Sequence, residues 1–172
     1  MAMGHHPVID LYICAGNRSK EVHKISLSID HGQLIIKILG SKLSENSGQV
    51  WRELKPNMNL PAARRLAERV NDFDFSIVKL EALRAKMARI SKRLWNIVVS
   101  PYCFRHDLTG RLKVFDGPTG DRVPQVLGQQ ADRTSSRYGT RTGKSGGAKE
   151  RVNPIVHVST INRSVDKPTY FS

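Results

Sequence analysis

Alternating apolar and polar residues predict a small antiparallel sheet in the first third of the chain. Residues 25–29 alternate in this way, as a strand with one buried face does. A turn at residues 30–32 follows, and residues 33–39 return as a second strand. Residues 50–54 favour a third strand, so we expect three antiparallel strands.

The strongest single pattern is an apolar stripe at helical spacing in the middle of the chain. Its members are Leu80, Leu83, Met87, Ile90, Leu94 and Ile97. Further helices are predicted over residues 60–73, from Tyr102 onward, over residues 123–127 before Gly128, and over residues 131–138. Residues 8–14 form an apolar run too short to assign. The predicted fold class is α+β, mainly helical.

The end of the chain has a different composition. Residues 139–147 are rich in Gly, Ser and Thr, which predicts a mobile connection. Residues 154–161 alternate enough to form a strand or a docking segment. We therefore expect a folded domain over residues 1–140 and a flexible basic tail over residues 141–172.

Charge narrows the class of partner. The chain carries 28 Lys and Arg against 15 Asp and Glu, a net charge of +13. Such a field attracts polyanions, of which nucleic acid is the commonest. A membrane surface is the competitor, but no apolar run approaches the roughly 20 residues that a spanning helix needs. The basic residues beside the helical stripe are either a solvated face or contacts to DNA: Arg84, Lys86, Arg89, Lys92 and Arg93.

The two cysteines, Cys14 and Cys103, provide neither a disulfide framework nor metal-ligand spacing. Both have apolar neighbours, so we expect buried free thiols in a reducing compartment. The N-terminus has no charged region followed by an apolar region, as a secretory signal would. Together with the charge, these features predict a cytoplasmic, nucleoid-associated protein.

Three blocks of sequence resemble the catalytic domain of the tyrosine recombinases, the phage integrase family. The first is AGNRSKEVHKISL, which contains Arg18 and Glu21. The second is ILGSKLSENSGQVWREL, a hairpin with Lys42. The third consists of SPYCFRHDLTGRL and VLGQQADRTSSRYG, with Arg105 and Tyr138. The resemblance covers residues 8–140 and implies an integrase-like catalytic core.

The resemblance implies a role for each of these residues. Arg18 and Arg105 would clamp the non-bridging oxygens of a DNA phosphate, because a guanidinium keeps its charge at any working pH. Lys42 would protonate the departing 5′-oxygen, and Tyr138 would attack phosphorus to form a 3′-phosphotyrosyl intermediate. The family needs no metal, cofactor or small-molecule substrate, and it assembles on double-stranded DNA as a homotetramer. A segment beyond Tyr138, here residues 154–161, would dock on a neighbouring protomer.

This chain departs from the family pattern at two catalytic positions and in its extent. Tyr102 and Gln129 stand where the family usually has histidine, so we predict slow chemistry. His106 is expected to be structural. The chain begins almost at the first block, without the helical DNA clamp that precedes it in the family. Weak and strongly salt-dependent DNA binding is the expected consequence.

Each residue also has a simpler interpretation. Arg18 can pair with Glu21 on a helix surface, Lys42 can be a solvated loop charge, and Tyr138 can be a packing residue. Two other classes of protein therefore stay open. One is an integrase remnant that only binds DNA. The other is a basic RNA-binding module, disfavoured because aromatic residues make up only 6% of the chain and no stacking platform is visible.

Overall fold

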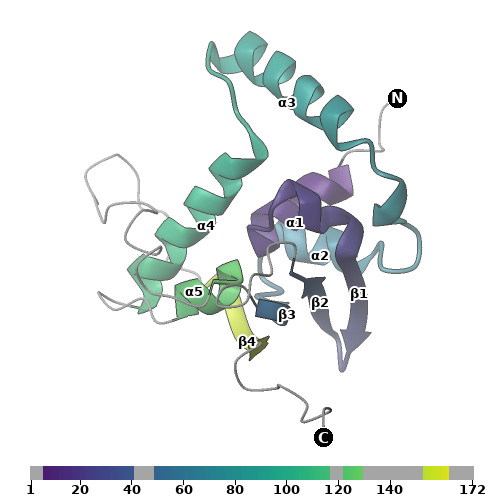
Figure 1. Cartoon of the computed structure of the whole chain (residues 1–172), viewed down its shortest axis with the longest axis vertical. Coiled ribbons are helices and arrows are strands. Elements are labelled where there is room, and N and C mark those ends of the chain that lie inside the picture. The colour runs from purple at the N-terminus through teal and green to yellow at the C-terminus, as the bar shows by residue number, and fades with distance from the viewer. Residues whose placement is uncertain (1–5, 41–48, 117–121, 130–152, 163–172) are drawn as a thin grey trace, which may run out of the picture.

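A four-stranded antiparallel sheet and the helices packed on it make an α+β fold (Figure 1). The computed structural model describes residues 6–40, 49–116, 122–129 and 153–162. The strands are β1 (Ile25–Asp30), β2 (Gln33–Leu39), β3 (Gln49–Pro56) and β4 (Ile155–Asn162), in the order β1-β2-β3-β4. The α-helices are α1 (His6–Ala15), α2 (Pro61–Ala67), α3 (Leu80–Trp95), α4 (Pro101–Asp116) and α5 (Arg122–Leu127). Two 3-10 helices complete the list, η2 (Ser19–Lys24) and η3 (Phe75–Ile77).

The first hairpin forms where the alternation predicts it. Ile29 pairs with Leu34 and Asp30 with Gln33, which leaves His31 and Gly32 as a two-residue turn. Both turn residues have positive φ, 48° and 76°, as a tight hairpin turn that matches strand twist requires. The turn therefore sets the register of both strands.

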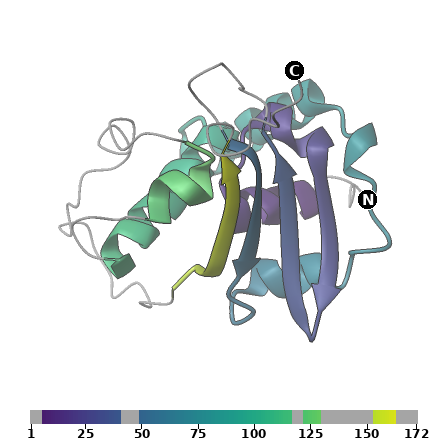
Figure 2. The same ribbon diagram turned by 60° about the horizontal axis from the view of Figure 1, so that its bottom comes forward.

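One face of the sheet forms the core. Leu34, Ile36 and Ile38 of β2 and Leu54 of β3 are fully buried on that face. Burying each such side chain contributes about 1.5–3 kcal/mol relative to leaving it exposed. Helices α1 and α2 lie behind this face, and α5 lies beside β4 (Figure 2). No helix in the described ranges has both the length and the apolar character to cross a bilayer.

The prediction of three strands is wrong, because the sheet has a fourth. β4 lies in the segment expected to be either a strand or a docking piece, and it pairs with β3 of its own chain, with Leu54 opposite Val158. The strand assignment is thus confirmed, and docking on a neighbouring protomer stays a prediction. The remainder of the expected tail lies outside the described residues, as does the helix expected over residues 131–138.

The apolar stripe of α3 is buried only in its first half. Leu83 and Met87 are buried, whereas Ile90 is 44% and Leu94 is 61% exposed. Figure 1 shows α3 extending away from the sheet, with the chain returning to α4 from its far end. Asn96 ends the helix in the left-handed conformation, with φ of 56°. The second half of α3 therefore exposes apolar side chains of the stripe as well as the basic side chains beside it.

The prediction of two buried thiols is correct for Cys14 and wrong for Cys103. Burial, together with the nearby charge of Asp10, raises the pKa of Cys14 to about 12. Cys103 lies on the exposed side of α4, where its Sγ atom is 3.8 Å from the Oγ atom of Ser100. The apolar neighbours of Cys103 in sequence point elsewhere because successive helical residues face different directions.

Candidate functional site

Arg105 joins three segments that are far apart in the sequence. It lies on α4, which begins at Pro101, a residue suited to a first helical turn. Its side chain is 1% exposed, and its Nη1 donates to the carbonyl of Gly16 at 2.8 Å. Its Nη2 donates to the carbonyl of Leu127, also at 2.8 Å. The end of α1, the first half of α4 and the end of α5 therefore meet at one guanidinium.

Gly16 permits this close approach. A Cβ atom at position 16 would lie 2.9 Å from Cδ2 of Leu108 and 3.5 Å from the Cα of Arg105. Its φ of +54° also favours glycine. The break predicted at the end of the first apolar run is therefore the point where the chain passes against α4 and turns toward Arg18.

Arg18 is anchored to a buried carboxylate. Its backbone N–H donates to Glu21 Oε2 at 2.8 Å, and its Nη1 contacts Glu21 Oε1 at 3.1 Å. The Arg18 side chain is 27% exposed, whereas that of Glu21 is fully buried. The pair that the simpler interpretation expected does form, but its carboxylate lies inside the molecule rather than on a helix surface.

A second arginine compensates the charge of Glu21. Arg52, 1% exposed on β3, donates from Nη2 to Glu21 Oε2 at 2.9 Å. Burial alone would raise the pKa of Glu21. The charge of Arg52 and the hydrogen bonds from Arg52 and Arg18 outweigh that effect and lower the pKa below its usual value. Glu21 is therefore ionised at neutral pH.

Gln129 lies next to the Arg105 contact. Its side chain is 8% exposed, and its backbone N–H donates to the carbonyl of Pro124 at 2.8 Å. Gly128, with φ of +68°, closes α5 as the sequence predicts. Gln129 is thus separated by one residue, Gly128, from Leu127, whose carbonyl binds Arg105.

The other predicted site residues lie elsewhere or outside the described ranges. Tyr102 is 52% exposed, and its ring packs edge-on against His106 with centroids 4.5 Å apart. It precedes Arg105 by one helical turn but faces the surface. Lys42 and Tyr138 lie outside the described residues.

The assembled cluster is cationic. Arg18 and Arg52 both bond to the Glu21 carboxylate, whereas Arg105 donates to the main-chain carbonyls of Gly16 and Leu127. Arginine forks bind the oxygens of phosphates in a fixed geometry. Within the described ranges, no three His, Cys, Asp or Glu side chains gather as they would around a metal ion. The arrangement is suited to holding an anion next to Arg18, the most exposed of the three.

Comparisons with known proteins add no relative. No family model, curated protein or solved structure matches the chain. The resemblance to the tyrosine recombinases thus depends on the residues quoted from the sequence alone.

Arg52 is the functional candidate that sequence reasoning missed. The signal was present, because residues 50, 52 and 54 alternate with Trp51 and Glu53 along the third strand. The apolar residue at position 54 faces the core, so the arginine two positions earlier has to face it too. A charge on the core side of a strand requires a buried partner.

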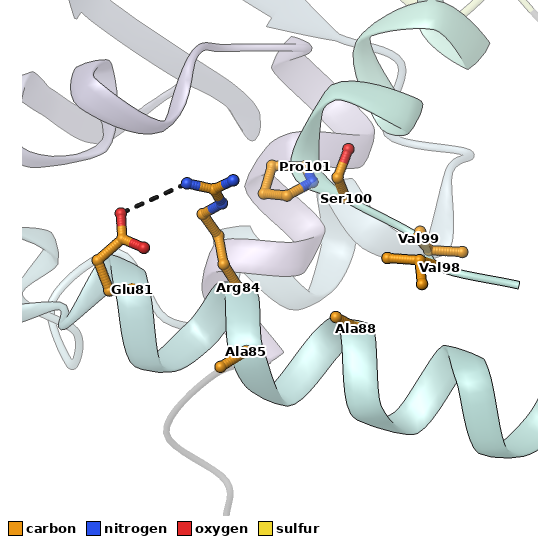
Figure 3. A pocket seen from close by; sticks show the side chains of 8 residues that line it. All are labelled: Glu81, Arg84, Ala85, Ala88, Val98, Val99, Ser100 and Pro101. Atoms are coloured by element: carbon orange, nitrogen blue, oxygen red, sulfur yellow. Dashed lines mark hydrogen bonds and ion pairs between the residues drawn. The ribbon is translucent and has the colours of Figure 1, made fainter.

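A shallow cavity of about 300 Å³ lies away from this cluster, between α3 and the segment leading into α4. Figure 3 shows its walls, with the ion pair of Glu81 and Arg84 at one end and Val98 and Val99 at the other. None of the predicted site residues lines it. The cavity therefore has no part in the candidate site.

Proposed function

We propose that this protein cleaves and rejoins DNA strands at specific sites through a tyrosine nucleophile, on an integrase-like catalytic core. One observation carries the proposal. Arg105 is bonded to Gly16, two residues before Arg18, and to Leu127, two residues before Gln129. The first block and the two segments of the third block, which resemble one family's catalytic motifs in sequence, therefore lie next to one another, and this proximity supports a shared phosphate site.

The proposed reaction transfers the phosphoryl group of one DNA phosphodiester to a tyrosine and then to a 5′-hydroxyl. The Tyr138 hydroxyl attacks phosphorus, gives its proton to water and forms a 3′-phosphotyrosyl bond, while the bond to the 5′-oxygen breaks. Lys42 supplies the proton that the departing 5′-oxygen takes up. Arg18 and Arg105 stabilise the negative charge that grows on the non-bridging oxygens. Attack by a free 5′-hydroxyl on the phosphotyrosine reverses the step and joins the strands.

The two departures from the family pattern bear on rate. Gln129 lies beside the Arg105 contact, and its side-chain amide can donate a hydrogen bond to a phosphate oxygen. Tyr102 is half exposed and lacks the ready protonation of histidine near neutral pH. We therefore propose slow chemistry on double-stranded DNA, in a homotetramer.

A second function has one observation in its favour. The terminal nitrogens of Arg105 bond to two main-chain carbonyls, which is what a purely structural arginine does. In that case the chain is an integrase remnant that binds DNA through its charge of +13 and performs no chemistry.

A covalent adduct distinguishes the two functions. The full chain is incubated with nicked duplexes whose sequence is randomised around the nick, so that cleavage releases a short strand and traps the intermediate. We expect a protein–DNA adduct on denaturing electrophoresis that disappears in Tyr138→Phe. Salt-sensitive gel shifts without an adduct would support the DNA-binding remnant and contradict the enzyme.

A further inference from the structure

Arg52 is a buried charge that lies between Glu21, which binds Arg18, and the turn formed by Leu127, Gly128 and Gln129. It belongs to β3, whose core-facing residues are otherwise apolar, and it is 1% exposed. Removing a guanidinium from water is costly, and strong partners must compensate. Its charge partner is Glu21, whose Oε2 accepts from Arg52 Nη2 at 2.9 Å. Such an expensive placement, next to residues with proposed catalytic roles, calls for an explanation.

On its first side, Arg52 fixes the carboxylate that holds Arg18. Oε2 of Glu21 accepts hydrogen bonds from Arg52 Nη2 and from the backbone N–H of Arg18. Oε1 of Glu21 accepts one from Arg18 Nη1. Both carboxylate oxygens are thereby oriented. Because Arg52 belongs to strand β3, its bond to Glu21 ties the carboxylate that binds Arg18 to the sheet. The direction of the Arg18 guanidinium is thus set from β3.

On its other side, Arg52 lies against the turn that follows α5. A Cβ atom at Gly128 would be 2.6 Å from Arg52 Nη1 and 3.2 Å from its Cζ atom. The glycine backbone therefore packs directly on the guanidinium. Gly128 separates Leu127, whose carbonyl binds Arg105, from Gln129. The same side chain that orients Arg18 thus supports the segment that contacts Arg105.

We propose that Arg52 is a positioning residue of the phosphate site, which sets the spacing between Arg18 and the Leu127–Gln129 turn. This inference rests on the proposed function. Arg52 touches neither DNA nor the reacting atoms and acts through Glu21 and Gly128. Two catalytic arms held at one spacing from a rigid strand bind the transition state better than arms that move independently.

The test separates the rate of adduct formation from DNA binding. Arg52→Lys keeps the charge but replaces the planar fork by one compact ammonium, which cannot hold Glu21 and support Gly128 together. We expect the rate at saturating DNA to fall by about a hundredfold, with DNA affinity unchanged. Arg122→Lys is the matched control, since Arg122 also ties a helix to β4 by donating to the Ile155 carbonyl at 2.8 Å. The control should keep the wild-type rate.

A second background tests whether Arg52 acts through Arg18. In a chain that already carries Arg18→Lys, the orientation imposed by Glu21 has little left to control. Arg52→Lys should then slow the reaction by a much smaller factor than in the wild type. A purely structural role would give the same factor in both backgrounds and would overturn the proposal.

Gly128→Ala provides a second variant if Arg52→Lys does not fold. It keeps every charge, strains the backbone at a φ of +68° and presses a methyl group on the Arg52 guanidinium, so it should also lower the rate and leave DNA affinity intact. A wild-type rate in a folded Arg52→Lys or Gly128→Ala protein would overturn the positioning role alone. Absence of any Tyr138-dependent adduct from the wild type would overturn the proposed function, and the positioning role with it.

Discussion

Arg105→Ala is expected to abolish adduct formation and to lower the melting temperature by roughly 10 °C. The substitution removes the donors for two buried carbonyls, of Gly16 and Leu127. Hydrogen bonds from a charged group contribute about 1.5–3 kcal/mol each, and a lost partner leaves its acceptor unsatisfied. Against a total stability of about 5–15 kcal/mol this is a large loss. Thermal unfolding followed by circular dichroism measures it.

The control for this prediction is Arg89→Ala, which removes an exposed arginine from α3. Exposed substitutions of this kind usually change stability by no more than about 0.5 kcal/mol. If Arg105→Ala and Arg89→Ala both have the melting temperature of the wild type, Arg105 does not hold the three segments together.

Glu21→Gln is expected to lower the free energy of unfolding at neutral pH by about 3 kcal/mol. It leaves the buried Arg52 guanidinium without its carboxylate, and loss of one partner from a buried ion pair is costly. Urea unfolding of both proteins at a series of pH values measures the difference. Glu81→Gln is the control, because the Glu81 side chain is 87% exposed in its pair with Arg84.

The pH dependence follows from the lowered pKa of Glu21. A carboxylate with a lowered folded pKa stabilises the fold above its unfolded pKa, about 4.3 for glutamate. That contribution is lost as the pH falls through the lower folded value. The difference between wild type and Glu21→Gln should therefore be full at neutral pH and shrink in the acid range. A difference that stays constant down to the lowest pH would mean that Glu21 acts through packing rather than charge.

Local patterns account for the elements that sequence reasoning predicted well. The β1–β2 hairpin has a two-residue turn between alternating strands, so its register is set within a few residues. Helix α5 ends where Gly128 takes a positive φ, as its position after an apolar run predicts. In both cases the residues that decide the structure are neighbours in the chain.

The errors concern features that depend on distant residues. The alternation near the C-terminus predicts a strand, but only the three-dimensional fold shows that β3 is its partner, about a hundred residues earlier. The stripe on α3 predicts a helix without revealing that nothing in the described ranges buries Leu94. Periodicity identifies an element and its apolar face, whereas burial depends on what packs against that face.

The candidate site shows the same division. The sequence resemblance singles out Arg18, Arg105 and Gln129, and the fold brings their segments together. The sequence predicts no role for Arg52, because the role proposed for it depends on contacts with Glu21 and Gly128 from two other segments. An arginine at a core-facing strand position is the one sequence signal that indicates such contacts.

The most direct test of the phosphate site compares charged and neutral DNA. In a methylphosphonate, a methyl group replaces one non-bridging oxygen at the scissile phosphorus, which removes the negative charge. We expect Arg18→Ala to slow adduct formation on ordinary DNA by about 10²–10³-fold, and to slow it far less on the methylphosphonate. The control Arg84→Ala should react at the wild-type rate on both substrates. Equal losses for Arg18→Ala on the two substrates would show that Arg18 supports the fold rather than the phosphate, and would contradict the account.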